Sequence, residues 1–344
     1  MPDDAIDQLL ERACPSIQYR VRGEILHQPP SDPDMRRLHD QILQDEAVQT
    51  IFGWQQPDGW LAWSFHGTPG MEVGVRLLCE KGLDASDPVV GEALAALEAR
   101  PDRLYRGIGK VGRILDERRL GGAQMIRAVV FAYAGVEDTP FVRDQIADAL
   151  DAFRALVDAA SLDDLCDEYR GKLIFKPGAL FPSIYHLRLL AFTQSWRAPE
   201  TCDLVAAAIR RLIAFSPIPP IHVRHGSQWI APASFCMDDF DPDMAMLDPA
   251  HWMMWFHRTE LLARLGVVGA IPELQRQVIR LREMMTLSDG RFMYQLTHPY
   301  FRRWNAYTGL MLERDWRTLE RRIHDLTFRS LLILHLAETR GADS

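Results

Sequence analysis

Four turns of the chain share one design, in which a proline begins a helix a few residues after an apolar helix has ended. The turns run from Gly82 to Pro88, from Gly135 to Pro140, from Trp196 to Pro199 and from Gly266 to Pro272. Successive prolines are 52, 59 and 73 residues apart (88 to 140, 140 to 199, 199 to 272), which describes a repeated helical hairpin with one long insertion. Because a repeat constrains architecture more firmly than a single motif does, this pattern predicts the fold first.

A glycine-bearing corner precedes each of these turns and completes the repeating unit. The corners are Asp58-Gly59-Trp60, Gly121-Gly122, Pro177-Gly178 and Asp289-Gly290. Proline at the first helical position loses no hydrogen bond that the helix needs, and Asp87 or Thr139 just before it can cap the free amides. The pattern predicts about a dozen helices, no strand and an all-α fold. We expect a single domain over residues 1–344, in which amphipathic helices at 1–13 and 33–49 make up an N-terminal part before the repeats.

Charge and cysteine usage limit the partners and the location. The net charge of -8 argues against a nucleic-acid backbone as the main partner, because that interaction depends on clustered basic residues. Five cysteines are scattered at positions 14, 79, 166, 202 and 236, which is typical of reduced thiols in a cytoplasmic protein. The chain has neither a basic and apolar leader nor a run of 18 apolar residues, so no membrane-spanning segment is expected. A peripheral contact with a membrane surface is left open.

The repeat pattern stops for roughly 33 residues between Ser216 and Asp248. A stretch of this length in a compact domain is usually either functional or disordered. Its aromatic residues, including Trp229 and Phe235, favour an ordered segment, and we expect it to fold over one mouth of the helical assembly. The following segment, His251–His257, has aromatics on nearly every face and predicts a buried helix of an inner ring.

The first corner and its helices resemble a known repeat. Trp54-Gln55-Gln56-Pro57-Asp58-Gly59-Trp60, an apolar helix, Gly82, Asp87-Pro88 and a second apolar helix are similar to the Gln-Trp repeat of the squalene-hopene cyclase and protein prenyltransferase superfamily. Ser288-Asp289-Gly290-Arg291-Phe292 is a weaker copy of the same corner. The resemblance covers about residues 50–340. It implies an α/α toroid, in which inner helices enclose an apolar cavity for a polyprenyl chain.

The reaction is not determined by this resemblance. A terpenoid cyclase of that superfamily would carry an Asp-x-Asp-Asp acid motif, whereas Asp238-Asp239-Phe240-Asp241 has the spacing in reverse. A protein prenyltransferase would carry an Asp, Cys and His trio around zinc, and the sequence places no such trio convincingly. The resemblance therefore supports the fold and leaves the chemistry open.

The acidic cluster in the insertion is the first candidate for catalysis. Crowded carboxylates in an apolar mouth raise the pKa of one of them, and a protonated carboxylic acid can protonate an alkene or epoxide. We therefore take Asp238, Asp239 and Asp241 as candidate catalytic acids. The same oxygen ligands could hold Mg²⁺ for a diphosphate, so magnesium is the cofactor left open. The alternative interpretation is a solvated acidic loop.

Candidate substrate-binding residues come from several segments. Aromatic faces in a pocket stabilise cations, and His or Tyr at a helix start can meet an anion. These candidates are Trp60, Tyr185, His186, His225, Trp229, Trp252, Trp255 and His298. Ordinary core packing explains most of the aromatics equally well, and hydrogen-bonded or surface His is the alternative for the imidazoles.

A second polar constellation follows the weaker corner. His298, Tyr300, Arg302, Arg303, Asn305 and Tyr307 supply the residue types of a toroid-fold polysaccharide lyase, in which one group neutralises a uronate and another abstracts its proton. The alternative is a solvated arginine face before the last helices.

Three functions remain from the sequence. The leading one is a terpenoid cyclase-like enzyme that holds a polyprenyl or related apolar substrate in a central cavity, with the Asp cluster as acid. The first alternative is a carbohydrate-active lyase or hydrolase of the same fold, which a polar centre would favour and a dry aromatic one would oppose. The second is a non-catalytic helical-repeat binding protein, which predicts no converging ionisable groups.

Overall fold

The computed structural model describes residues 3–240, 252–296 and 308–339, which are mostly helical and include one small four-stranded sheet. The all-α prediction is therefore right for most of the chain and wrong for the sheet. No helix in these ranges is long and apolar enough to cross a membrane. The prediction of a single domain stays a prediction.

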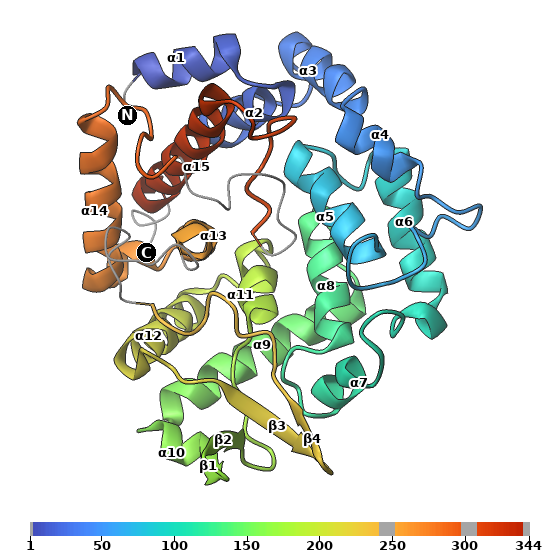
Figure 1. Ribbon diagram of the computed structural model, residues 1–344, viewed down its shortest axis with the longest axis vertical. Helices are drawn as coiled ribbons and strands as arrows, with labels where there is room; N and C mark the ends of the chain where they lie inside the picture. The colour runs from blue at the N-terminus through green and yellow to red at the C-terminus, as the bar shows by residue number, and fades with distance from the viewer. Residues whose placement is uncertain (1–2, 241–251, 297–307, 340–344) are drawn as a thin grey trace.

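Six helical segments lie around the middle of the molecule (Figure 1). They are α2 (Pro15–Arg20) with the π-helix η1 (Val21–Ile25), α5 (Met71–Lys81), α8 (Ala123–Tyr133), α11 (Ile184–Ala191), α13 (Trp252–Leu265) and α15 (Leu319–Thr339). Contacts run from α5 to α8, from α8 to α11, from α11 to α13 and from α13 to α15, and α15 also contacts α2 and η1. An ion pair joins the two ends of this series, with 2.9 Å between Arg20 Nη1 of α2 and Glu80 Oε2 of α5.

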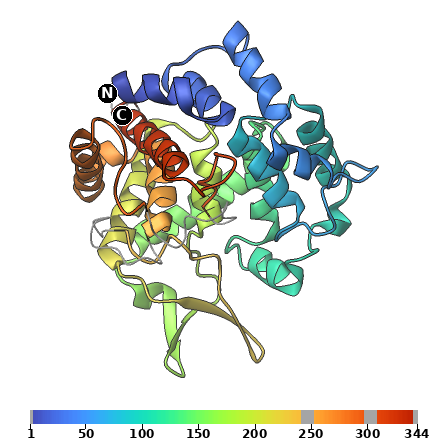
Figure 2. The same cartoon turned by 45° about the horizontal axis from the view of Figure 1, so that its top comes forward.

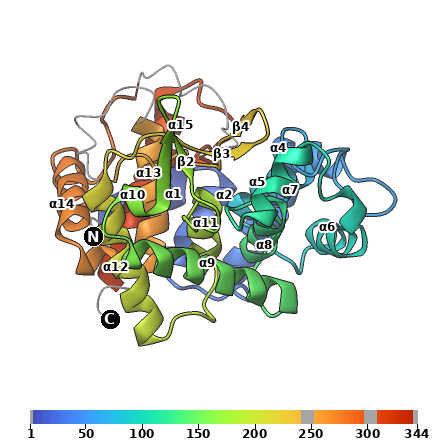
Figure 3. The ribbon, with the colours of Figure 1, turned by 90° about the horizontal axis from the view of Figure 1, so that it is seen from below.

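The helices that begin at the repeated prolines lie outside these six segments (Figure 1). They are α6 (Pro88–Ala99), α9 (Pro140–Asp158), α12 (Pro199–Phe215) and α14 (Pro272–Thr286), and all four proline starts are confirmed. Seen from below, α9 and α12 lie side by side (Figure 3). The remaining helical elements are α1 (Asp3–Arg12), α3 (Pro33–Leu43), α4 (Glu46–Phe52), η2 (Pro101–Arg103), α7 (Gly109–Glu117), α10 (Leu162–Leu165) and η4 (Val268–Ala270).

The predicted side-chain caps at two proline turns are wrong. Neither Asp87 nor Thr139 accepts a cap hydrogen bond from the helix that follows it. The Asp87 carboxylate points back into the turn, where it accepts a 2.9 Å hydrogen bond from the Asp84 amide and lies 2.9 Å from His39 Nε2. The carboxylate thus fixes the turn before α6 rather than the helix itself.

The small sheet consists of two hairpins joined side by side. Strands β1 (Cys166–Tyr169) and β2 (Lys172–Phe175) are antiparallel, β2 pairs in parallel with β3 (Ile221–His225), and β3 pairs antiparallel with β4 (Gln228–Ile230). Both hairpins project from the helical body (Figure 2). Period-two alternation of buried Ile221 and Val223 with His222 and Arg224 was the available signal for a strand.

The corner that resembles the Gln-Trp repeat is packed against its neighbouring helix. Trp60 is fully buried, and Gln55 Nε2 donates a 3.0 Å hydrogen bond to Glu92 of α6. Gly59 has a left-handed φ of 81°, and a Cβ there would stand 2.7 Å from the Glu92 carbonyl oxygen. Glycine is therefore required at this corner for both backbone conformation and close packing.

Candidate functional site

The segments around the middle of the molecule carry many buried ionisable side chains. Six of them, three arginines and three glutamates, form the arginine–glutamate network: Arg20, Glu24, Glu80, Glu260, Arg264 and Arg329. Arg329 of α15 contacts Glu80 at 2.7 Å and Glu260 at 2.8 Å. Arg264 of α13 contacts Glu24 at 2.6 Å. Equal numbers of opposite charges, closely paired, allow such groups to stay ionised away from water.

The electrostatics of the network favour the charged forms of Glu80 and Arg329. Burial opposes ionisation of Glu80, but Arg329, Arg20 and Arg76 outweigh it and lower the pKa of the carboxyl to about 2. Burial likewise opposes the charge on Arg329, but Glu260 and Glu80 outweigh it and raise the pKa of the guanidinium. The network therefore holds four segments together and has a structural role.

A second group of polar side chains, all of them buried except His66, lies on α5, α8, α11 and α13 and on the turn before α5. We call it the central cluster, and it consists of His66, Glu72, Arg76, Tyr133, Tyr185, Arg188 and His257. The Arg76 guanidinium carbon lies 5.5 Å from the centre of the Tyr133 ring. The corresponding distance from Arg188 to the Tyr185 ring is 5.3 Å. A guanidinium group therefore lies near a phenol between α5 and α8, and a second one does so within α11.

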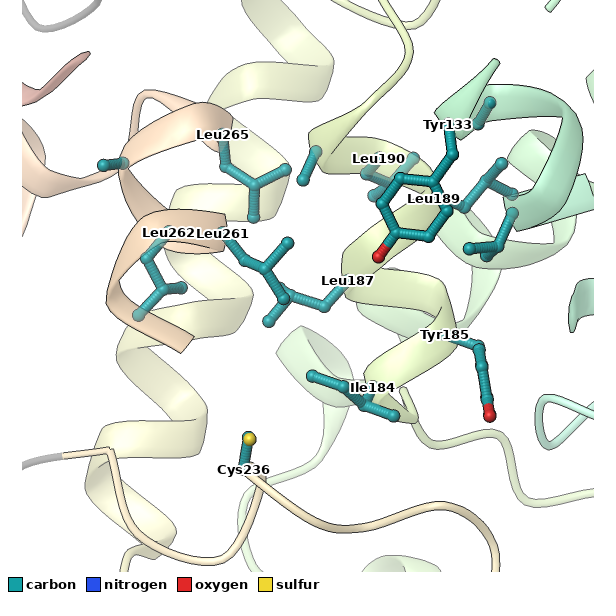
Figure 4. Close-up of a cluster of buried hydrophobic side chains, with 14 of the residues drawn as sticks. Tyr133, Ile184, Tyr185, Leu187, Leu189, Leu190, Cys236, Leu261, Leu262 and Leu265 are labelled. Atoms are coloured by element: carbon teal, nitrogen blue, oxygen red, sulfur yellow. The ribbon is translucent and has the colours of Figure 1, made fainter. Parts of the chain in front are cut away.

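Helix packing explains how these phenols come together. Tyr133 of α8 and Tyr185 of α11 lie on the same side of α11, whereas Leu187 faces Leu261 of α13 (Figure 4). Leucines thus fill part of the contact between α11 and α13, and the two phenols lie on the α8 side of α11.

His257 takes part as a hydrogen-bond acceptor. Arg188 Nε and Nη2 each lie 3.2 Å from His257 Nε2, and a guanidinium can only donate. His257 must therefore be neutral, with its proton on Nδ1. Burial and the nearby Arg188 and Arg76 charges lower the pKa of this imidazole well below its usual value, in agreement with the geometry.

His66 and Glu72 form a histidine–carboxylate pair at the edge of the cluster. His66 Nδ1 lies 2.8 Å from Glu72 Oε2. Burial opposes ionisation of Glu72, but the His66 hydrogen bond and the charges of His66, Arg188 and Arg76 outweigh it and lower the pKa of the carboxyl. An ionised Glu72 only accepts, so Nδ1 donates and Nε2 is left as the basic nitrogen. The His66 side chain is 34% exposed, so the cluster reaches the surface at this residue.

Both phenols stay protonated. Burial raises the pKa of Tyr133, and the Arg76 and Arg188 charges reduce this effect without reversing it. Burial and the Glu72 charge likewise raise the pKa of Tyr185. The Tyr133 hydroxyl is buried and has no hydrogen-bond partner among the described residues. Each phenol is therefore a potential proton or hydrogen-bond donor.

The predicted acidic residues lie elsewhere. Asp238 and Asp239 are half-buried, and Asp238 lines an apolar cavity of about 180 Å³ together with Phe175, Phe181, Ile218 and Met237. The Asp239 carbonyl accepts a hydrogen bond from Arg258 Nη1 of α13. Asp241 lies outside the described residues.

Tyr185 and His186 are neighbours on α11 with different surroundings. Tyr185 belongs to the central cluster, with its ring centre 6.4 Å from that of His66. His186 Nδ1 accepts a 2.9 Å hydrogen bond from the Ser183 amide and so caps the start of α11. Burial and the Arg119 charge lower the pKa of His186 to about 3. His186 lines a separate cavity of about 80 Å³.

The other predicted binding residues are spread over the molecule. Trp60 and Trp255 are buried, and Trp255 Nε1 donates a 2.9 Å hydrogen bond to Gln277 of α14. His225 and Trp229 lie in the β3–β4 hairpin, where His225 is exposed and Trp229 half-buried. The Trp252 side chain and His298, with the constellation up to Tyr307, fall outside the described residues.

Metal binding is not indicated by the described residues. Within 3–240, 252–296 and 308–339, no group of three or more His, Cys, Asp or Glu side chains could hold a metal ion. Asp238 and Asp239 alone therefore do not make the magnesium site that the sequence left open.

Several residues of the central cluster were missed by the sequence interpretation. Arg76 stands in the apolar run Val73–Leu78 of α5, and Arg188 stands among the leucines of α11. A charged residue inside a helix that is apolar on most faces signals a buried charge, and buried charges need partners or a function. That signal could have identified both arginines.

Comparison with known proteins identifies no relative of this chain. No protein-family model, no curated protein and no solved structure matches this chain.

Proposed function

We propose that the protein is an α/α toroid enzyme that acts on an anionic substrate at the central cluster. The toroid is supported by the order of contacts α5–α8–α11–α13–α15–α2, by the Arg20–Glu80 ion pair between its ends, and by the proline-initiated helices outside them. Sequential helices that alternate between an inner and an outer position are the defining pattern of this class of fold.

The observation that carries the function is the convergence of Arg76, Arg188, Tyr133 and Tyr185 with the His66–Glu72 pair. Two guanidinium groups suit a carboxylate substrate, which they bind and neutralise. A neutral phenol and a carboxylate-oriented imidazole suit proton transfer. A non-catalytic scaffold needs no such convergence, and a hydrocarbon cavity would be lined by apolar groups at this position.

Among glycosidic-bond chemistries, elimination fits these residues better than hydrolysis. A glycoside hydrolase uses two carboxyl groups on either side of the bond. In the described part of the central cluster Glu72 is the carboxylate, and Glu80, two turns further along α5, is held by the arginine–glutamate network. A lyase needs a base, an acid and a cation for the uronate, and His66, Tyr185 and Arg188 supply these three.

The proposed step removes the proton α to the substrate carboxylate. His66 Nε2 takes this proton while Arg188 and Arg76 neutralise the carboxylate and so increase the acidity of the C–H bond. The C–H electron pair forms the ring double bond, and the bond from the β carbon to the glycosidic oxygen breaks. The leaving oxygen takes the Tyr185 phenol proton. Exchange with water then removes the proton from His66 and restores that of Tyr185.

Incubation with uronate polymers tests this proposal. We expect cleavage of at least one of polygalacturonate, hyaluronate and alginate, and no cleavage of neutral cellohexaose, because the arginines require a carboxylate. Elimination gives fragments whose masses sum to that of the parent, together with absorbance of an unsaturated uronate. Fragments that have gained water would overturn the lyase mechanism. Absence of both binding and cleavage with all three polymers would overturn the anionic substrate.

A terpenoid cyclase-like function is a second candidate, favoured by the apolar cavity beside Asp238. A cavity of about 180 Å³ lies below the usual range of about 300–1,000 Å³ for small-molecule sites, so it would hold only part of a polyprenyl chain. Asp238, the first residue of the reversed Asp motif, could then serve as the acid.

Ligand retention distinguishes this candidate. Native mass spectrometry with polyprenyl diphosphates and squalene, with and without Mg²⁺, should give an adduct that Ala233→Leu removes, because Ala233 lines the cavity. Lys110→Leu, at an exposed position on α7 away from the cavity lining, is the control and should retain the adduct. Equal retention by the wild type and Ala233→Leu would exclude the cavity as the binding site.

A cytoplasmic location remains part of the proposal. All five cysteines are free, which agrees with a reducing compartment.

A further inference from the structure

We infer that the outward face of the small sheet is a docking platform for an acidic polysaccharide chain. This inference rests on the proposed function, because it deepens the identity of the substrate. The platform consists of Tyr169, Lys172, Arg224 and Trp229, with Arg170 at the turn between β1 and β2.

Strand register places these residues on one face. Tyr169 is paired with Lys172, and Arg224 is paired with Trp229. Residues paired across strands share a face, as do residues two apart along a strand. The parallel pair Ile174–His222 then places Lys172 and Arg224 on the same side of the sheet. The opposite face carries Val223 and Ile221, which are buried.

The platform combines aromatic rings with exposed cations. The Tyr169 and Trp229 ring centres are 5.8 Å apart. The Arg224 guanidinium carbon lies 4.2 Å from the Tyr169 ring centre, and Lys172 Nζ lies 5.1 Å from that of Trp229. Both cationic side chains are exposed, whereas the rings are half-buried and so rigidly held. A sugar ring can stack on such a surface while its carboxylate meets the cations.

The cations of this surface are not neutralised by ion pairs with described carboxylates. Within the described ranges of the chain, no ion pair joins a carboxylate to Arg170, Lys172 or Arg224, and the one on this sheet joins Asp167 to Lys176. Asp167, on the same face, lies 3.9 Å from Lys176. The three cations outnumber the Asp167 carboxylate on the same face, so in a chain of net charge -8 this surface has a local positive excess suited to a polyanion.

The platform is connected to the central cluster through the chain. Phe175 and Ile221 of the sheet line the apolar cavity, and so does Ser183, which caps α11. Tyr185 and Arg188 follow on that helix. The cavity thus lies on the opposite face of the sheet from the platform, at the start of the helix that carries the proposed acid and cation. A uronate polymer is the polyanion that the proposed function predicts for this platform.

Direct binding measurements on the full chain test the platform independently of turnover. Affinity electrophoresis in polygalacturonate should show binding by the wild type that is weakened at least about tenfold in the Lys172→Glu/Arg224→Glu double variant. Trp229→Ala should weaken binding about tenfold through loss of stacking. The matched control is Lys110→Glu/Arg143→Glu, which makes the same charge change at exposed positions on α7 and α9 and should bind as the wild type does.

The outcomes separate the two proposals. Equal binding by the platform variants and the control would overturn the platform, as would tighter binding of single-stranded oligothymidylate than of polygalacturonate. Loss of binding only in the platform variants supports the platform even when no polymer is cleaved, and absence of cleavage then counts against the proposed function alone. Circular dichroism identifies a variant that has not folded.

Discussion

Replacement of Arg329 by Met is expected to lower the free energy of unfolding by about 3–5 kcal/mol or to prevent folding. Arg329 is 1% exposed and contacts Glu80 at 2.7 Å, Glu260 at 2.8 Å and the Gly309 carbonyl at 2.8 Å. Met fills a similar volume but leaves two buried carboxylates without the arginine that they share. Urea unfolding followed by circular dichroism measures the loss.

The pH dependence of this loss identifies its cause. In the wild type the pKa of Glu80 is lowered from 4.5 to about 2, because the arginines outweigh burial. A lowered carboxyl pKa contributes stability that is fully present above pH 4.5 and is lost as the pH falls toward 2. In the variant Glu80 is more easily protonated, and protonation removes the unpaired charge. The difference between the two proteins should therefore be largest at neutral pH and shrink below pH 4.5.

An exposed ion pair provides the control. Arg282 lies 2.6 Å from Glu338, and their side chains are 51% and 48% exposed. Arg282→Met should lower the free energy of unfolding by less than about 1 kcal/mol, because water screens this pair. Similar losses in the two variants, or a difference between the wild type and Arg329→Met that does not change with pH, would contradict the role assigned to the network.

The second large effect is expected at the central cluster. His66→Ala should lower turnover of the uronate polymer that the wild type cleaves by about 10²–10⁴-fold, because it removes the proposed base. Glu72→Gln should lower turnover less, since the amide keeps a contact with His66 but no longer fixes its basic tautomer. Arg188→Met should weaken the interaction with the carboxylate and lower kcat/KM by about 10²–10³-fold.

A second histidine–carboxylate pair is available as a control. His39 Nε2 lies 2.9 Å from Asp87 Oδ1, and His39 is 29% exposed, comparable with His66. His39→Ala should fold and keep wild-type turnover, because this pair lies between α3 and the turn before α6, outside the central cluster. Turnover by His66→Ala at the wild-type rate would exclude His66 as the base, whether or not Arg188→Met is impaired.

Local covalent geometry made much of the helical framework predictable. The proline ring fixes φ and removes an amide donor, so Pro88, Pro140, Pro199 and Pro272 each mark a helix start independently of distant contacts. Gly82 has a φ of 112° and ends α5, as its place in the turn pattern required. These features depend on a few neighbouring residues and can be read from the sequence.

The sheet and the caps were harder to predict because they depend on distant or competing partners. The parallel partner of β2 is β3, in which Ile221 lies 48 residues beyond Leu173, the residue of β2 that it pairs with. Strands of three to five residues carry little periodicity of their own. The Asp87 carboxylate could accept a hydrogen bond either from the helix that follows it or from the turn before it. It accepts one from the Asp84 amide and lies beside His39, and so does not cap α6.

The candidate site also combines residues that the sequence identified with residues that only distant contacts bring together. Tyr185 was identified from the sequence by its position at a helix start, and the structure adds Arg76, Arg188 and the His66–Glu72 pair around it. Asp238 and Asp239 were identified by their density, but density along the chain does not determine which side chains meet. The sequence by itself determined the helical repeat, since backbone preferences act over a few residues. Only the tertiary structure decided which charges are buried together, because Glu80 and Arg329, 249 residues apart, acquire their pKa values from each other's position in space.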